Sequence, residues 1–568
     1  MKYKLPIMFI IIISQFLLSR IPDAVGYNGI VVSSNEYASN IGLNVLKNGG
    51  NAIDAAVAVS FALAVVHPGA GNIGGGGFMV IRTSDGKVTT IDFRETAPSL
   101  ATKDMYLDDS LNVIPNLSWS SALSSGVPGS VAGMWDAHQK FGTINWKKLI
   151  IPSVKLAKFG FKLDPLNCSL FNSSRYKSLL SADVEAKKIF TKSTPFLIGE
   201  NFIQTDLSKT LDRIALFGAS DFYNGEASKN IVKCMKRTGG IISASDLEEY
   251  KSIQRDPISF DYKGYTIHTM PPPSSGGIAL AGILNQLENI DISAIPYHSS
   301  DYIHYITEAE KRVYADRSVY LGDPDFNDIP IKTLISDTYS SKRWASVDTL
   351  LATQSTSIKE GVLIKEKEET THFSIADKWG NAVSVTTTVN GWFGNGIVVD
   401  NCGFILNNEM DDFSAKPGYP NKYGLVGNKA NSIEPKKRML SSMTPTIVEN
   451  LNGELFLVLG SPGGSTIITT VAQLILNVID KKMNIKDAVE SSRFHHQWLP
   501  DLIFLEPFSF QRETIIDLEN RGHKVQFRDY IGEANCIKID YMGTNNNQNK
   551  VIYTGAGDSR RGASAVGY

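Results

Sequence analysis

The chain has 568 residues, of which 42% are hydrophobic and 20% charged, with a formal net charge of −2 and a pI near 6.5. This composition is typical of a globular protein that can bury a substantial core. Because no cluster of Lys and Arg is interleaved with aromatic residues, nucleic acid is excluded as an expected partner.

The first residues have the features of a targeting segment. Two lysines precede the apolar run Ile7–Leu18, and Ala24-Val25-Gly26 offers small residues for cleavage before Tyr27. We therefore expect residues 1–26 to be a signal peptide and the protein to be exported, either periplasmic or secreted. The run is too short to span a bilayer comfortably, so no stable membrane span is expected after its removal. Arg20 is atypical after the run and leaves open an N-terminal anchor if the segment is retained.

Glycine-rich turns alternate with helical patterns in the first part of the chain. Ala52–Val66 is an Ala-rich apolar segment that predicts a buried helix. Asn72–Gly77 contains four consecutive glycines but no following Lys-Ser/Thr, so it does not predict a phosphate loop. Close backbone packing ahead of a strand at Phe78–Arg82 is the expected role.

A charged run with no apolar periodicity, Lys365–Glu369, precedes Thr370 and predicts an exposed connector that can be cut. If the bond between Glu369 and Thr370 were broken, the α-amine of Thr370 would lie beside its own hydroxyl. Nucleophile and base would then belong to one residue. Taken alone, the pattern is more typical of a Thr-rich strand that begins after a loop.

Strands dominate from Thr370 onward. Thr371–Asp377, a tight turn at Trp379-Gly380 and Ala382–Val389 predict a β-hairpin. A two-residue loop would pair Asp377 with Ala382 and bring Thr370 opposite Val389, so that Thr388 lies within one residue of Thr370 across the hairpin. A second hydroxyl is therefore expected beside the candidate nucleophile.

A polar segment at 413–437 shows no apolar period and predicts a lid or binding loop. After it, Glu454–Leu459 predicts a strand that ends at a glycine-rich turn, and Ser465–Ile479 predicts an apolar helix. Gly463 and Gly464 lie where the strand passes into the helix, where free backbone N–H groups suit a developing oxyanion. An ordinary strand-to-helix turn is the alternative interpretation.

Charged groups suggest a polar ligand, although each has a structural alternative. Glu409 and Met410-Asp411-Asp412 form an acidic cluster that is suited to an ammonium group, or alternatively a solvated turn. Arg94 is a candidate for bidentate binding of a carboxylate, or alternatively a member of a structural ion pair. Ser441-Ser442 is typical of a turn.

No metal site and no disulfide framework are predicted. His495 and His496 are adjacent, so they point apart and lack a partner at a zinc-like spacing. The four cysteines are widely spaced and form no CxxC pair.

Together these segments resemble the γ-glutamyltransferase (γ-glutamyltranspeptidase, or glutathione hydrolase) family of N-terminal-nucleophile hydrolases. The similarity extends from about Gly29 to Tyr568, and its most specific motifs are Thr370–Ser374, Met410–Gly418 and Gly460–Ser465. The resemblance implies an α+β fold, a four-layer αββα sandwich. It also implies that one precursor is self-cleaved into a large subunit, 27–369, and a small subunit, 370–568, which remain together as a heterodimer.

The resemblance further implies an activity that needs no cofactor. Thr370 would take the γ-glutamyl group from glutathione or a related compound and pass it to water or to an amino acid or dipeptide acceptor. The resemblance implies that Thr388 orients Thr370 and that Gly463 and Gly464 form an oxyanion hole. Arg94, Ser441 and Ser442 would bind the α-carboxylate of the donor, and Asn390, Glu409 and Asp412 would bind its α-ammonium group. Tyr423 would close the lid over the bound donor. Two residues depart from the pattern: Met439, where many relatives have Pro, and Glu409, where some bacterial members have Gln.

Two other functions are compatible with the chain. One is a sibling threonine acylase, either a poly-γ-glutamate depolymerase or a glutaryl or cephalosporin acylase; a glutaryl group would leave Asp412 without an ammonium partner. The other is an inactive exported binding protein, which would be expected to have lost Thr370 or the Gly463-Gly464 turn, and this chain has both.

Overall fold

The computed structural model describes residues 20, 22–359, 370–416, 429–542 and 550–568, together with Gly418, Tyr419, Asn421, Lys422, Leu425 and Gly427. Two seven-stranded antiparallel sheets lie at its centre. The first sheet has the order β19 (Ser564–Gly567), β2 (Gly29–Ser33), β10 (Thr371–Asp377), β11 (Ala382–Thr388), β3 (Gly76–Arg82), β4 (Val88–Asp92), β7 (Ile253–Arg255). The second has the order β1 (Ala24–Gly26), β18 (Lys550–Gly557), β17 (Asn535–Met542), β13 (Leu455–Leu459), β12 (Thr446–Glu449), β9 (Tyr265–Thr269), β8 (Ile258–Tyr262).

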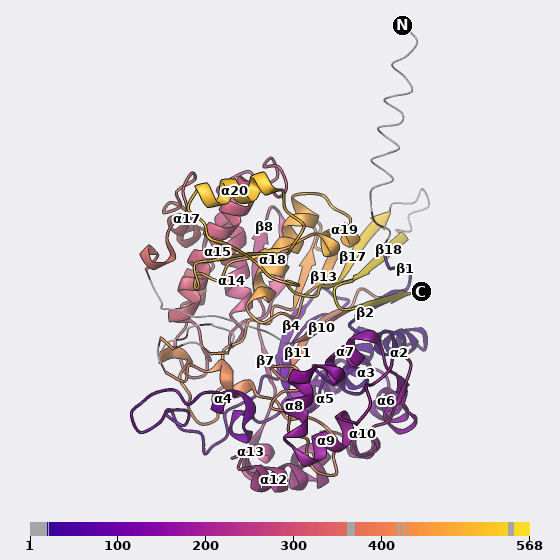
Figure 1. Cartoon of the computed structure of the whole chain (residues 1–568). Coiled ribbons are helices and arrows are strands. Elements are labelled where there is room, and N and C mark those ends of the chain that lie inside the picture. The colour runs from indigo at the N-terminus through magenta and orange to yellow at the C-terminus, as the bar shows by residue number, and fades with distance from the viewer. Residues whose placement is uncertain are drawn as a thin grey trace.

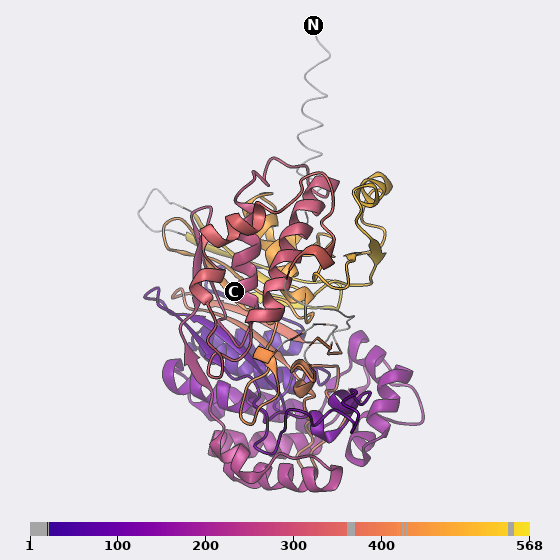
Figure 2. The same ribbon diagram turned by 90° about the vertical axis from the view of Figure 1, so that its left-hand side faces the viewer.

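Helices cover the outer faces of both sheets, which confirms the expected four-layer α+β sandwich (Figure 1). The first sheet is covered by α2 (Glu36–Lys47), α3 (Ala52–Val66), α5 (Ser130–Phe141), α6 (Trp146–Phe159) and α10 (Thr205–Phe217). The second is covered by α14 (Gly276–Leu287), α15 (Ser300–Tyr320), α18 (Thr466–Ile479) and α19 (Ile485–Glu490). Figure 2 shows the same order from the side, with the indigo-to-magenta helices below the strands and the rose helices above them.

Shorter elements complete the layers. The helices are α4 (Leu117–Ser120), α7 (Pro165–Asn172), α8 (Ser174–Ser181), α9 (Val184–Phe190), α11 (Ala219–Asn224), α12 (Glu226–Thr238), α13 (Ala244–Glu249), α16 (Ile331–Leu334), α17 (Asp337–Trp344) and α20 (Arg512–Asn520). Two small sheets pair β5 (Phe161–Lys162) with β6 (Asn201–Phe202), and β15 (Ile503–Leu505) with β14 (Phe494–His495) and β16 (Val525–Phe527).

Side-chain alternation along β10 explains why this strand lies in the middle of the sandwich. Phe373 and Ile375 face the helical layer and join the core built around α3. His372 and Ser374 face the second sheet, where the Ser374 Oγ donates to the Asn535 carbonyl (2.8 Å). A strand buried on both faces places the residue at its start, Thr370, at the edge of the inter-sheet space.

Most elements predicted from local pattern are confirmed. The predicted buried helix is α3, which has the expected bounds and is buried along its whole length. It begins with a capping box in which the Asn51 Oδ1 accepts from the Asp54 N–H (2.9 Å) and the Asp54 Oδ2 accepts from the Asn51 N–H (3.0 Å). The strand predicted at Phe78–Arg82 is part of β3, and the strand predicted at Glu454–Leu459 corresponds to β13. The apolar helix predicted at Ser465–Ile479 is α18.

The hairpin of β10 and β11 is confirmed, but its predicted register is wrong by one residue. Ala376 pairs with Ala382, so the loop consists of Lys378, Trp379 and Gly380. The Asp377 carboxylate builds this wider turn, since its Oδ1 accepts from the N–H groups of Trp379 (2.9 Å) and Asn381 (3.0 Å). Thr371 consequently pairs with Thr387, and the position directly opposite Thr370 is Thr388 itself.

The N-terminal segment contributes an edge strand that bears on the expected signal peptide. Strand β1 pairs with β18, and the Asp23 Oδ2 accepts from the Lys486 Nζ (2.8 Å) and the Gly557 N–H (2.8 Å). Cleavage before Tyr27 would remove this strand from the sheet. The apolar run Ile7–Leu18 lies outside the described residues, and none of the helices that are described has the length and apolar character needed to cross a bilayer.

Candidate active site

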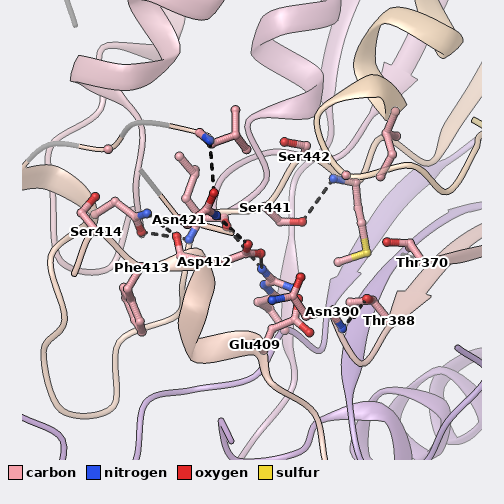
Figure 3. A pocket seen from close by; sticks show the side chains of 18 of the residues that line it. Thr370, Thr388, Asn390, Glu409, Asp412, Phe413, Ser414, Asn421, Ser441 and Ser442 are labelled. Atoms are coloured by element: carbon pink, nitrogen blue, oxygen red, sulfur yellow. Dashed lines mark hydrogen bonds and ion pairs between the residues drawn. The ribbon is translucent and has the colours of Figure 1, made fainter. Parts of the chain in front are cut away.

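A pocket lies beside the start of β10 and brings together most of the predicted site residues (Figure 3). Those that line it are Thr370, Thr388, Arg94, Asn390, Glu409, Asp412, Ser441, Ser442 and Gly464. Gly463 directly precedes Gly464 but is not among the lining residues. Glu369 and Tyr423 lie outside the described residues.

Thr370 and Thr388 lie side by side at the ends of β10 and β11 (Figure 3). Thr370 is buried, with 5% of its surface exposed, and it precedes a strand that is held on both sides by β2 and β11. The Thr388 Oγ1 accepts a hydrogen bond from the Asn390 N–H (2.7 Å). This contact requires a turn at Asn390, whose φ of 71° lies in the left-handed region that Asn tolerates.

A buried imidazole supports the strand below Thr370. The His372 ring is held by the Thr386 Oγ1 (Nδ1, 2.9 Å) and the Ser374 Oγ (Nε2, 3.1 Å). Burial lowers the pKa of His372 to about 3, so the ring is neutral at physiological pH. A Cβ on Gly460 would lie 2.4 Å from the His372 Cε1, which explains the glycine that ends β13. Since both ring nitrogens are engaged, His372 positions the strand and is not the base for Thr370.

The glycine turn leads from β13 into α18. Gly463 and Gly464 have φ values of 135° and 50°, a region where glycine is favoured. The turn is fixed from behind by His495, whose ring contacts the Ser465 Oγ (Nε2, 3.2 Å) and the Thr469 Oγ1 (Nδ1, 2.9 Å). Backbone N–H groups at the beginning of such a helix favour a negative charge, so Gly464 faces the pocket with the polarity that an oxyanion needs.

The predicted basic and acidic groups form a single cluster. Arg94 is fully buried, and its guanidinium forms ion pairs with Glu409 and Asp412. It also donates to the carbonyls of Met439 (Nε, 3.2 Å) and Leu440 (Nη2, 3.2 Å). Four of its five N–H donors are therefore engaged within the protein. We expected Arg94 to bind a ligand carboxylate through two hydrogen bonds. Such binding would require Arg94 to release either Glu409 or Asp412.

A third carboxyl group lies behind this cluster. Glu95 is fully buried, its Oε2 is 3.8 Å from the Arg94 Nη1, and among the described residues neither of its oxygens has a hydrogen-bond donor. Burial raises the pKa of Glu95 to about 8, although the charge of Arg94 opposes this shift. Burial also raises the pKa of Glu409, again against the attraction of Arg94. Both buried carboxyl groups are consequently shifted toward their protonated forms.

The remaining member of the predicted acidic cluster, Asp411, points elsewhere. Its carboxylate accepts from the Ser118 hydroxyl and from the Lys422 N–H (2.8 Å). Asp412 stays at the pocket, where its Oδ1 accepts from the Asn421 Nδ2 (3.2 Å). A 3-10 turn over Glu409–Asp412 separates the two neighbouring side chains in this way.

Two serine hydroxyls also line the pocket. The Ser441 Oγ accepts from the Met443 N–H (3.1 Å), and the Ser442 Oγ accepts from the Arg317 Nη2 (3.1 Å). Each hydroxyl thus uses an acceptor position inside the protein, and its own O–H can donate into the pocket. This pair is suited to an anion.

One group outside the pocket has the composition of a metal site. His304, Glu308 and His523 place ligand atoms within 4.8 Å of one another. The two imidazoles contact each other (Nδ1 to Nε2, 2.8 Å), and Glu308 is ion-paired with Lys311 (3.0 Å) and Arg312 (2.7 Å). Because the Glu308 carboxylate already pairs with two cationic side chains, we interpret this group as a structural network of ion pairs and hydrogen bonds and not as a metal site.

The sequence matches one family over nearly its whole length. Residues 38–568 match the family model described as Gamma-glutamyltranspeptidase. This chain belongs to the γ-glutamyltranspeptidase family. It is 48% identical over 514 residues to the glutathione hydrolase proenzyme of Escherichia coli K12, with 90% of this chain and 88% of the relative covered. It is 45% identical over 549 residues to the glutathione hydrolase proenzyme of Pseudomonas sp. A14, with 95% and 94% covered.

Solved structures agree with this assignment. The γ-glutamyltranspeptidase of Helicobacter pylori is 44% identical, with a TM-score of 0.57, and covers 61% of this chain and 97% of its own. A cephalosporin acylase from Bacillus halodurans is 24% identical with a TM-score of 0.83 over 97% of both chains, which shows a shared fold. As a member of this γ-glutamyltranspeptidase family, the chain is an enzyme of the N-terminal-nucleophile type.

Some residues at or behind the pocket could not be predicted from the sequence of this family member. Arg317 lies in the long helix α15 without any motif around it. Asn431 supports Asp412 by donating to its backbone carbonyl (2.7 Å) and lies in a segment that has no apolar period. Glu95 is next to Arg94 in the sequence, but its burial behind the cluster is a tertiary feature.

Proposed function

We propose that this chain is a self-processing glutathione hydrolase and γ-glutamyltransferase. One observation supports the proposal: a single pocket is lined by Thr370 and also by anionic and anion-binding side chains, with Thr370 apart from Glu409 and Asp412 (Figure 3). A γ-glutamyl donor has the matching shape, since an amide carbonyl and an α-amino acid group lie at opposite ends of one short chain. The printed names of the bacterial relatives, glutathione hydrolase proenzymes, support the same substrate.

The first reaction is cleavage of the chain at Glu369–Thr370. The Thr370 hydroxyl attacks the Glu369 carbonyl, the peptide C–N bond breaks, and the nitrogen takes up a proton as the Thr370 α-amine. Water then hydrolyses the resulting ester and leaves a carboxylate on Glu369. The large subunit would comprise 27–369, or begin upstream if β1 is retained, and the small subunit would comprise 370–568. The first sheet supports lasting association, because β10 and β11 lie between β2 and β3.

The second reaction is transfer of the γ-glutamyl group. The free α-amine of Thr370, with an ordinary pKa of about 7.7–8.0, accepts the hydroxyl proton as the oxygen attacks the donor γ-carbonyl. Thr388 orients the nucleophile, and the N–H groups of Gly463 and Gly464 stabilise the oxyanion. The C–N bond breaks, the leaving amine takes the proton, and a γ-glutamyl ester remains on Thr370. Water or the amino group of an amino acid or dipeptide then attacks this ester.

Recognition of the donor uses the far end of the pocket. Glu409, Asp412 and Asn390 bind the α-ammonium group, and Ser441 and Ser442 donate to the α-carboxylate with Arg94 beside them. Tyr423 closes the site as part of the lid segment. No cofactor takes part, and the lysines and apolar run near the N-terminus support export to the periplasm or medium.

The sibling acylase function makes a different prediction about donors. Because Arg94 pairs with Glu409 and Asp412, both carboxylates have a partner even when a donor brings no ammonium group. Kinetics therefore separate the functions: a glutathione hydrolase turns over a γ-glutamyl anilide faster than a glutaryl anilide, and a glutaryl acylase shows the reverse order.

Mass spectrometry and N-terminal sequencing of the purified, incubated protein test the proposal. We expect two fragments in the wild type, with Thr370 leading the smaller one, and release of glutamate from glutathione. Thr370→Ala should remain a single inactive chain, and Thr370→Ser should process slowly. A wild-type chain that stays intact under all conditions would refute the mechanism, and the first residue of the larger fragment shows whether β1 is retained.

A further inference from the structure

A second buried arginine, Arg317, also lines the pocket. It lies near the C-terminal end of α15, is 4% exposed, and reaches the pocket from the helical layer over the second sheet. Its Nη2 donates to the Ser442 Oγ (3.1 Å), and its Nε donates to the Ser275 Oγ (2.8 Å).

Ser275 connects Arg317 to the backbone of the serine pair. The Ser275 Oγ and N–H both donate to the Ser441 carbonyl, at 2.6 and 2.7 Å. The Ser441 N–H in turn donates to the Pro273 carbonyl (2.9 Å), so residues 441–442 are attached to the segment that begins α14. Arg317 therefore holds one hydroxyl of the pair directly and the backbone of the other through Ser275.

The direction of these bonds determines what Ser442 can do. Because Arg317 donates to the Ser442 Oγ, the hydroxyl hydrogen must point away from the guanidinium, and Ser442 lines the pocket, so its O–H is available to a group bound there. A charged donor on the oxygen also polarises the O–H bond and makes it a stronger donor. An anion in the pocket thus meets an oriented O–H with a positive charge directly behind it.

Arg94 leaves this task open. Its ion pairs with Glu409 and Asp412, together with the two carbonyl contacts, engage four of its N–H groups. Its positive charge is also balanced by the two carboxylates that it touches. A donor α-carboxylate consequently needs its charge compensation from the serine side of the pocket.

We propose that Arg317 is a positioning residue that orients and polarises Ser442 and thereby sets the preference of the enzyme for acyl donors that carry an α-carboxylate. The inference rests on the proposed function. It adds to that function a residue that acts on one group of the donor, through a neighbour, and leaves the chemistry at Thr370 unchanged.

Three anilides separate the groups of the donor. The γ-glutamyl anilide carries both the α-carboxylate and the α-ammonium, the glutaryl anilide carries only the carboxylate, and the 4-aminobutyryl anilide carries only the ammonium. For Arg317→Gln we expect kcat/KM to fall by roughly tenfold to a hundredfold on the two carboxylate donors, mainly through KM, and to change by less than about threefold on the 4-aminobutyryl anilide. Arg317→Lys, which restores the charge, should recover part of the loss.

The matched control is Arg343→Gln. Arg343 is a neighbouring arginine that borders the same apolar cavity behind Arg317, pairs with Asp316 (3.1 Å) and does not line the pocket. We expect this variant to affect all three donors alike. An equal loss on all three anilides for Arg317→Gln, or a profile that matches Arg343→Gln, would overturn the inference and show a structural role. A processed wild type that fails on the γ-glutamyl anilide would instead overturn the proposed function.

Discussion

Replacement of the buried Glu95 by Gln gives a test with a defined sign. Burial raises the pKa of Glu95 from 4.5 to about 8, so the folded protein binds a proton that the unfolded chain releases above pH 4.5. This contribution to stability is complete below the unfolded pKa and is lost as the pH rises through the folded pKa. The free energy of unfolding should fall by about 1.4 kcal/mol per pH unit in this window, or about 3 kcal/mol from pH 6 to 9.

Glu95→Gln removes this dependence while it keeps the shape of the side chain. We expect its stability to match the parent below about pH 4.5 and to exceed that of the parent by about 2 kcal/mol at pH 6 and about 5 kcal/mol at pH 9. Urea unfolding followed by tryptophan fluorescence measures the difference, in a Thr370→Ala background that remains a single chain. Glu513→Gln, on the exposed face of α20, is the control and should run parallel to the parent. Parallel curves for Glu95→Gln from pH 6 to 9 would refute the reasoning.

Two further substitutions test the donor site and its support. Asp412→Asn should cost about 2–5 kcal/mol in kcat/KM on a γ-glutamyl anilide and much less on a glutaryl anilide, because only the first donor brings an ammonium group; an equal loss on both would contradict the assignment. Gly460→Ala places a Cβ 2.4 Å from the His372 ring, so we expect a loss of about 1–3 kcal/mol in stability and slower turnover, since His372 supports the strand that Thr370 begins. An unchanged melting temperature and rate would show that the ring can move aside.

Elements with a strong local signal were predictable from the sequence. The α3 helix is Ala-rich and mostly apolar and has a capping box at its start, so its bounds follow from neighbours in the chain. The hairpin of β10 and β11 was predictable as a hairpin, but its register was not. An Asp377 side chain that accepts two backbone N–H groups widened the turn by one residue, and period-2 alternation carries no information about that contact.

The sequence by itself determined the family of this protein through a threonine after a charged run, a glycine turn between strand and helix, and acidic and serine pairs in a family order. Only the tertiary structure decided how these groups meet. Arg94 and Asp412 are more than 300 residues apart in the chain yet form one ion pair, and Arg317 reaches Ser442 from a helix in another layer. Such contacts depend on the packing of two sheets and two helical layers, which places residues by distance in space and leaves no periodicity in the chain.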